Sequence, residues 1–100
     1  MNMQQMMAQA QKMQRELAKA HKEIDEKEFK VTKGGAVTVS MLGTKEVTEV
    51  SIDEDAFDID NKEMVEEMLM MAVNELIEQI NTARGDVNER ITGRREGVGL

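Results

Sequence analysis

The sequence contains no cysteine, proline, tryptophan or tyrosine, and its two aromatic residues are Phe29 and Phe57. Without cysteine there is no disulfide, no thiolate nucleophile and no cysteine metal site. Two phenylalanines offer little surface for stacking exposed bases, which argues against a single-strand nucleic-acid platform built on aromatic residues. The absence of proline suits long helices.

The sequence also lacks the signals of export and membrane insertion. Its start, MNMQQMMAQAQKMQ, has neither the charged beginning nor the apolar run of a secretory signal. No apolar stretch approaches membrane-spanning length, so we expect a cytoplasmic protein with no membrane partner. One hundred residues predict a single domain whose core is small enough that oligomerisation is expected.

Residues that could carry catalysis are sparse. The single histidine, His21, is expected to be solvated on a helix surface, and no Ser–His–Asp grouping is evident. The acidic run that begins at Asp53 fails the spacing of a calcium loop, because Asp58 would occupy position six and Met64 position twelve. A carboxylate-based metal enzyme would need acids that converge in a pocket. We therefore predict no enzymatic activity, cofactor, metal site or small-molecule substrate.

Charge is distributed unevenly along a chain whose formal net charge is −7. Residues 1–24 hold four bases and two acids, residues 25–81 hold five bases and fifteen acids, and residues 82–100 hold four bases and three acids. The three segments therefore carry +2, −10 and +1. Because screening confines electrostatic contact to roughly 8–10 Å, the local sign of the surface decides which partner it can bind.

The segment from about Asn2 to Asp25 has helical periodicity. Its apolar residues alternate at intervals of three and four and form a narrow seam: Met3, Met6, Ala10, Met13, Leu17, Ala20 and Ile24. Four cations share this spacing on the opposite side of the helix: Lys12, Arg15, Lys19 and Lys22. The seam could pack on its own domain or on a partner chain. The line of cations is either an ordinary solvated face or a contact surface for a polyanion.

Three strand-like segments follow, separated by the turns Lys33-Gly34-Gly35 and Gly43-Thr44-Lys45. They predict an antiparallel meander with one apolar face. We expect that face to include these residues of the second and third strands: Val37, Val39, Met41, Thr48, Val50 and Ile52.

A long helix is predicted from Asp60, in the capping role, to about Ile91, with a wide apolar stripe that would cover the sheet. The fold class is therefore α+β. Residues 1–92 form one domain, and residues 93–100 are expected to be a flexible tail.

Three segments in register resemble the YbaB/EbfC family of bacterial nucleoid-associated proteins. The first is MNMQQMMAQAQKMQRELAKAHKEI, which resembles the Met- and Gln-rich first helix of that family. The second is GGAVTVSMLGTKEVTEVSID, and the third is DNKEMVEEMLMMAVNELIEQI, which resembles its last helix. The ending departs from the family pattern, since Thr92-Gly93 is followed by Arg94-Arg95 without a proline.

The resemblance implies a tweezer-like homodimer that binds double-stranded DNA, helps to organise the nucleoid and affects gene expression. It places DNA contacts on the first and last helices. Together with the charge pattern, this selects six candidate DNA-binding residues: Lys12, Arg15, Lys19, Lys22, Arg84 and Arg90. The alternative hypothesis is a coiled-coil-like adaptor that holds a protein partner without binding DNA.

Overall fold

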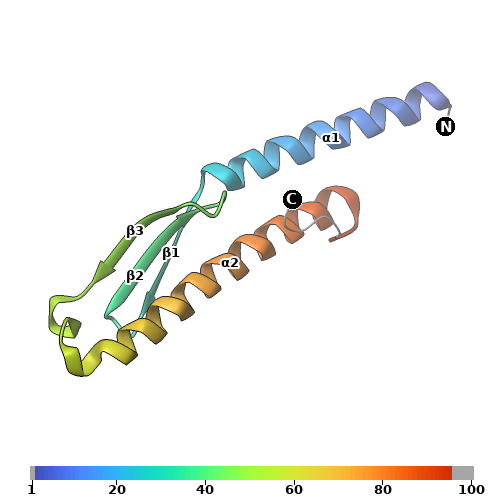
Figure 1. Ribbon diagram of the computed structural model, residues 1–100. Coiled ribbons are helices and arrows are strands. Elements are labelled where there is room, and N and C mark those ends of the chain that lie inside the picture. The colour runs from blue at the N-terminus through green and yellow to red at the C-terminus, as the bar shows by residue number, and fades with distance from the viewer. Residues whose placement is uncertain (1, 96–100) are drawn as a thin grey trace.

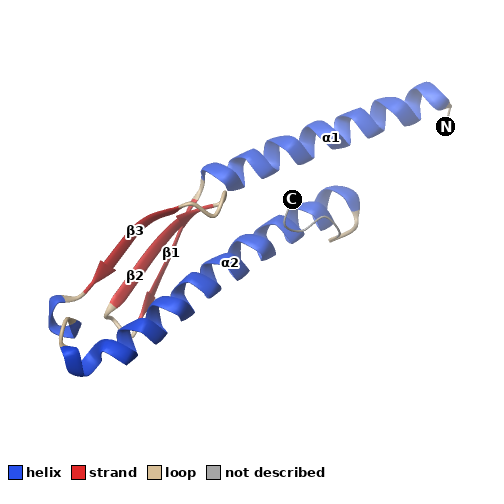
Figure 2. Cartoon of the chain, viewed as in Figure 1, coloured by secondary structure: helices blue, strands red, loops and turns tan. Residues whose placement is uncertain are grey.

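The computed structural model describes residues 2–95 and has the predicted α+β architecture (Figures 1 and 2). One helix precedes a three-stranded antiparallel sheet, and a longer helix follows it. The elements in chain order are α1 (Met3–Glu26), β1 (Glu28–Lys33), β2 (Val37–Leu42), β3 (Val47–Ile52), the 3₁₀ turns η1 (Glu54–Ala56) and η2 (Ile59–Asn61), and α2 (Lys62–Thr92).

A capping box starts α1. The side chain of Asn2 accepts a hydrogen bond from the Gln5 N–H at 2.8 Å, and the Asn2 N–H donates to the Gln5 side chain at 3.2 Å. These bonds satisfy two donors that a helix start leaves unpaired. The helix ends at Glu26 because Lys27 is extended, with its N–H bound to the carbonyl of Ile24 at 3.1 Å.

The sheet has the order β1-β2-β3, and α2 lies along the face of β1 and β2 (Figure 2). Phe29 pairs with Met41 and Val31 with Val39, so the apolar residues of the two strands share one face. They form the core with residues of α2 and the end of α1, and the complete cluster is Ile24, Phe29, Val31, Val37, Val39, Met41, Ala72, Leu76 and Ile80.

The third strand lies outside the cover of α2. Val50 pairs with the fully buried Val39, yet its own side chain is 52% exposed. A register shift at Ser40/Met41 places Val47 opposite Met41. The prediction that Thr48 shares the apolar face was therefore wrong. Because of the register shift, Val47 rather than Thr48 lies opposite the buried Met41.

The loop before α2 uses its acids differently from the prediction. Asp60 is not the cap: the helix follows Asn61, which makes no side-chain capping bond. Instead the carboxylate of Asp58 accepts from the Asp60 N–H at 2.9 Å, and that of Asp53 accepts from the Asp55 N–H at 3.0 Å. These local bonds hold the two 3₁₀ turns.

The C-terminal end of α2 falls within one residue of the predicted position. Gly93 adopts the left-handed conformation, with φ of 81°, and its N–H binds the carbonyl of Glu89 at 2.8 Å. Glycine tolerates this conformation at a helix end without steric cost. The predicted flexible tail lies mainly outside the described residues, which end at Arg95.

The molecule is elongated, with extents of 69 × 19 × 16 Å. Helices α1 and α2 run antiparallel, and the N-terminal part of α1 extends away from the sheet (Figure 1). Near the sheet α1 buries Ala20 and Ile24, whereas Met3 and Met6 farther out are 76% and 58% exposed. The chain thus consists of a sheet-and-helix body and a helical arm.

Candidate nucleic-acid interface

The predicted line of cations lies on the outer side of α1. Lys12, Arg15, Lys19 and Lys22 are all exposed, whereas Ala20 and Ile24 are buried toward the body. A helical turn of 3.6 residues places the two sets on opposite sides of the same helix. Among residues 2–95, none of these four cations takes part in an ion pair, so their charges face solvent.

Arg90 lies beside this helix rather than on it. It is exposed in the last turn of α2, where a cation interacts favourably with the helix dipole. Together with Glu16, Lys19 and Ala20 it lines a shallow hollow between the two helices. The structure therefore places Arg90 near Lys19 of the line on α1.

Arg84 is a correction to the predicted set, because its side chain is buried and faces α1. Only 5% of its surface is exposed. Its guanidinium forms an ion pair with Asp25 and donates to the Gly43 carbonyl at 2.9 Å. A cation held in this way has no exposed face for a phosphate. The spacing could have revealed it, since Arg84 continues the four-residue steps of the buried Leu76 and Ile80.

His21 also departs from the prediction, which placed it in solvent. Its ring is partly buried between α1 and α2. Nε2 lies 2.7 Å from Oδ1 of Asn88, and Nδ1 lies 2.9 Å from Nη1 of Arg84. Sequence position gave no sign of these contacts, because Arg84 and Asn88 are 63 and 67 residues away along the chain.

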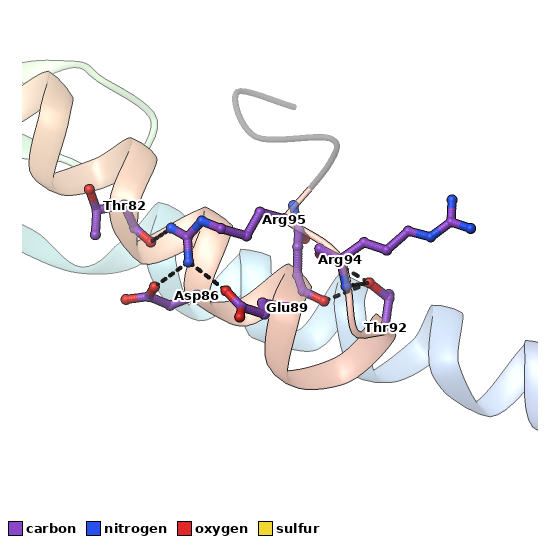
Figure 3. A network of polar contacts seen from close by, with 7 residues as sticks. Thr82, Asp86, Glu89, Thr92, Arg94 and Arg95 are labelled. Atoms are coloured by element: carbon purple, nitrogen blue, oxygen red, sulfur yellow. Dashed lines mark hydrogen bonds and ion pairs between the residues drawn. The ribbon is translucent and has the colours of Figure 1, made fainter.

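Arg94 and Arg95 follow α2 and form hydrogen bonds with residues of that helix (Figure 3). Nη1 of Arg95 donates to Asp86 and to Glu89, each at 2.8 Å, with the side chain laid along the end of the helix. The hydrogen bond to Asp86 is the main reason that the pKa of Arg95 is raised, and Glu89 adds to it. The Arg94 N–H donates to the Thr92 hydroxyl oxygen at 3.1 Å.

The opposite end of the molecule is acidic. Residues 53–67 carry one base, Lys62, and eight acids: Asp53, Glu54, Asp55, Asp58, Asp60, Glu63, Glu66 and Glu67. No group of three metal-ligating side chains gathers anywhere in the described part of the chain. Across the same residues, no helix has the length and apolar character needed to cross a membrane.

Fold and surface together define a small α+β protein that carries an exposed line of cations on a projecting helical arm. The chain belongs to the YbaB/EbfC DNA-binding family, whose model matches residues 1–95. This membership confirms the resemblance seen in the three sequence segments.

Relatives cover nearly the whole chain. A nucleoid-associated protein of Agathobacter rectalis is 41% identical over 93 residues, which are 92% of this chain and 82% of the relative. A nucleoid-associated protein of Clostridium novyi is 36% identical over 94 residues, with coverages of 93% and 82%. One from Mycoplasmopsis pulmonis is 36% identical over 91 residues, which are 91% of this chain and 90% of that protein.

A solved structure shares the fold. The crystal structure of an uncharacterised protein from Helicobacter pylori matches with a TM-score of 0.73 and covers 90% of this chain and 96% of its own. The two sequences are 22% identical, so this likeness supports the α+β architecture of one helix, three strands and a long helix.

Proposed function

We propose that this chain acts as a homodimeric nucleoid-associated protein that binds double-stranded DNA through its α1 arms, helps to organise the nucleoid and affects gene expression. The observation that carries the proposal is the line of exposed, unpaired cations on the arm of an otherwise acidic chain. Membership of a DNA-binding family and the names of its nucleoid-associated relatives support it.

The line is suited to the phosphate backbone. From Lys12 to Lys22 it extends about 15 Å along the helix axis, because each helical residue adds 1.5 Å. Lysine and arginine contacts to phosphates give affinity that does not depend on base sequence and that weakens with salt. Arg90 would add a contact from α2, close to Lys19.

The acidic body would restrict where DNA can bind. Residues 25–81 carry a net charge of −10, and the acid-rich loop around η1 and η2 lies at the end of the molecule far from the tip of α1 (Figure 1). Phosphates are repelled from such a surface and attracted to the arm. The negative net charge of the chain therefore does not oppose the proposal.

An uncovered apolar surface supports the homodimer. Val47 and Val50 of β3 are 46% and 52% exposed, and Phe57 and Ile59 in the following loop are each 80% exposed. β3 is also an edge strand of the sheet. Exposed apolar residues next to an edge strand are typical of a surface that another chain covers.

One observation supports the alternative hypothesis, a coiled-coil-like adaptor that holds a protein partner. The outer part of the α1 seam is uncovered, with Met3, Met6 and Met13 at 76, 58 and 39% exposed, and the neighbouring Met7 is 56% exposed. Methionine-rich surfaces adapt to varied partners. On this hypothesis the cations would serve solubility, and duplex DNA would not bind even at low salt.

The test is to replace the four cations Lys12, Arg15, Lys19 and Lys22 by glutamine. We expect the variant to remain folded, because all four side chains are exposed, and to lose most of its affinity for a fluorescent duplex in an anisotropy titration. The slope of log affinity against log salt should fall by about 0.9 for each phosphate contact removed.

A matched control removes the same charge from the body, through glutamine at Lys27, Lys30, Lys45 and Lys62, all of which are exposed. It should keep near-normal affinity. Equal losses in the two variants would show that net charge alone governs binding, and an unchanged affinity in the arm variant would reject the proposed interface.

A further inference from the structure

We propose that Arg84 is a positioning residue for DNA binding, whose buried guanidinium, together with a neutral His21, fixes the direction of the α1 arm relative to the body. The inference deepens the proposed function and rests on it. We call the five residues concerned the arm latch: His21, Asp25, Gly43, Arg84 and Asn88.

The arm latch joins three elements at the point where α1 meets the body. Nη2 of Arg84, on α2, donates to the Gly43 carbonyl in the β2–β3 turn at 2.9 Å and forms an ion pair with Asp25 in the last turn of α1. Nη1 lies 2.9 Å from Nδ1 of His21, one turn earlier. One planar cation on α2 therefore binds both α1 and the β2–β3 turn, which a single ammonium group could not do in the same geometry.

The hydrogen bonds define the protonation state of His21. A guanidinium donates hydrogen bonds and accepts none, so Nδ1 must accept from Arg84. The proton of a neutral ring then lies on Nε2, which donates to the side-chain oxygen of Asn88 at 2.7 Å. Both ring nitrogens are thus satisfied by the neutral tautomer, whereas the doubly protonated ring could not accept from Arg84.

The arm has few other attachments. Apart from the latch, α1 buries Ala20 and Ile24, while most of its remaining length is exposed. The backbone of the β2–β3 turn reaches the end of α1 so closely that a Cβ on Gly43 would overlap the Ile24 carbonyl oxygen. With so little apolar contact, the polar contacts of Arg84 contribute strongly to the angle at which α1 leaves the body.

The latch depends on the acceptor that His21 provides. Nη1 of Arg84 donates to Nδ1 of His21, and Arg84 is buried. Removing that acceptor would leave a buried donor without a partner, which disfavours the latched arrangement.

The experiment measures the direction of the arm without DNA. Since the chain has no cysteine, Gln9→Cys and Gln79→Cys at two exposed positions provide one spin-label pair across α1 and α2. Dilution with unlabelled chain restricts the measured distance to one protomer. We expect a narrow distance distribution when the latch residues are unchanged.

Four variants test this expectation. Arg84→Met should broaden the distribution. His21→Leu removes the acceptor for Nη1 of Arg84 and should also broaden it, whereas His21→Asn keeps a side-chain acceptor and should leave it narrow. Arg15→Met, on the exposed line, should leave the distance unchanged.

Duplex affinity provides the second readout. Arg84→Met should lower it by about three- to tenfold without changing the salt slope, whereas Arg15→Met should reduce the slope. A His21→Leu variant whose distribution stays as narrow as that of the wild type would overturn the role of His21. An unchanged distance in Arg84→Met would overturn the positioning role. If the wild-type chain bound no duplex at all, the proposed function would fail. The spin-label distances would still show whether Arg84 sets the direction of α1.

Discussion

At the scale of single residues, Gly43 is the described glycine at which an added side chain would meet the closest backbone contact. It lies in the β2–β3 turn against the end of α1, and its N–H donates to the Lys27 carbonyl at 3.0 Å. The nearest atoms to a Cβ placed there would be the backbone carbonyl group of Ile24, which cannot move without shifting the helix. Gly85 differs, because a Cβ there would meet the flexible guanidinium of Arg95.

Gly43→Ala should therefore destabilise the chain. We expect a loss of about 3 kcal/mol in the free energy of unfolding, the upper part of the usual range for overpacking. Urea denaturation followed by circular dichroism measures it. Thr44→Ala, at the exposed neighbouring position, is the control and should change stability by less than about 0.5 kcal/mol. Equal stability of the two variants would mean that the turn does not contact α1 this closely.

At the scale of elements, β3 differs from the other two strands in having no helix over its apolar residues. Val39 of β2 is fully buried, and its register partner Val50 is half exposed. In the described chain α2 packs on β1 and β2, so it leaves the third strand, β3, uncovered. In the proposed homodimer, we expect a second copy to bury this part of the sheet.

If β3 lies in the proposed homodimer interface, Val50→Glu should weaken subunit association. An uncompensated charge buried in an interface costs roughly 3–5 kcal/mol, which would raise the dimer dissociation constant by a hundredfold or more. Sedimentation equilibrium measures the shift. Ser51→Glu places the same charge on the opposite face of β3 and should leave the dimer intact. A dimer of normal affinity in Val50→Glu would place the subunit interface elsewhere.

Periodicity was sufficient to predict the elements. The three-and-four spacing identified α1, and alternation identified β1 and β2, because these patterns follow directly from helix and strand geometry. The register of β3 could not be predicted in the same way, since the shift at Ser40/Met41 depends on how two strands pair. The start of α2 was misplaced because Asp60 has capping chemistry but lies within the turn that precedes the helix.

The candidate site was only partly predictable, for a related reason. The line from Lys12 to Lys22 follows from spacing on one helix and could be derived locally. Burial of Arg84 depends on Asp25 and Gly43, which are 59 and 41 residues away, so charge alone placed it wrongly on the surface. The same long-range contacts explain why His21 was expected in solvent.

At the scale of the whole molecule, charge and shape divide the chain into two ends. The arm carries the line of four exposed cations, and the far end carries the acid-rich loop, in a molecule 69 Å long. Duplex DNA should therefore contact the arm and avoid the loop. Because the proposed contacts are made to phosphates, they should weaken steeply as salt rises.

Site-specific photocrosslinking tests this central claim most directly. A photoreactive label is attached to a cysteine at Ala8, which lies on the basic side of α1, or at Glu67 in the acidic segment; both positions are exposed. We expect the Ala8→Cys protein to crosslink a duplex at low salt and to lose the crosslink at high salt, while the Glu67→Cys protein gives little at either. Crosslinking that is equal at both positions, or stronger at Glu67, would contradict the account.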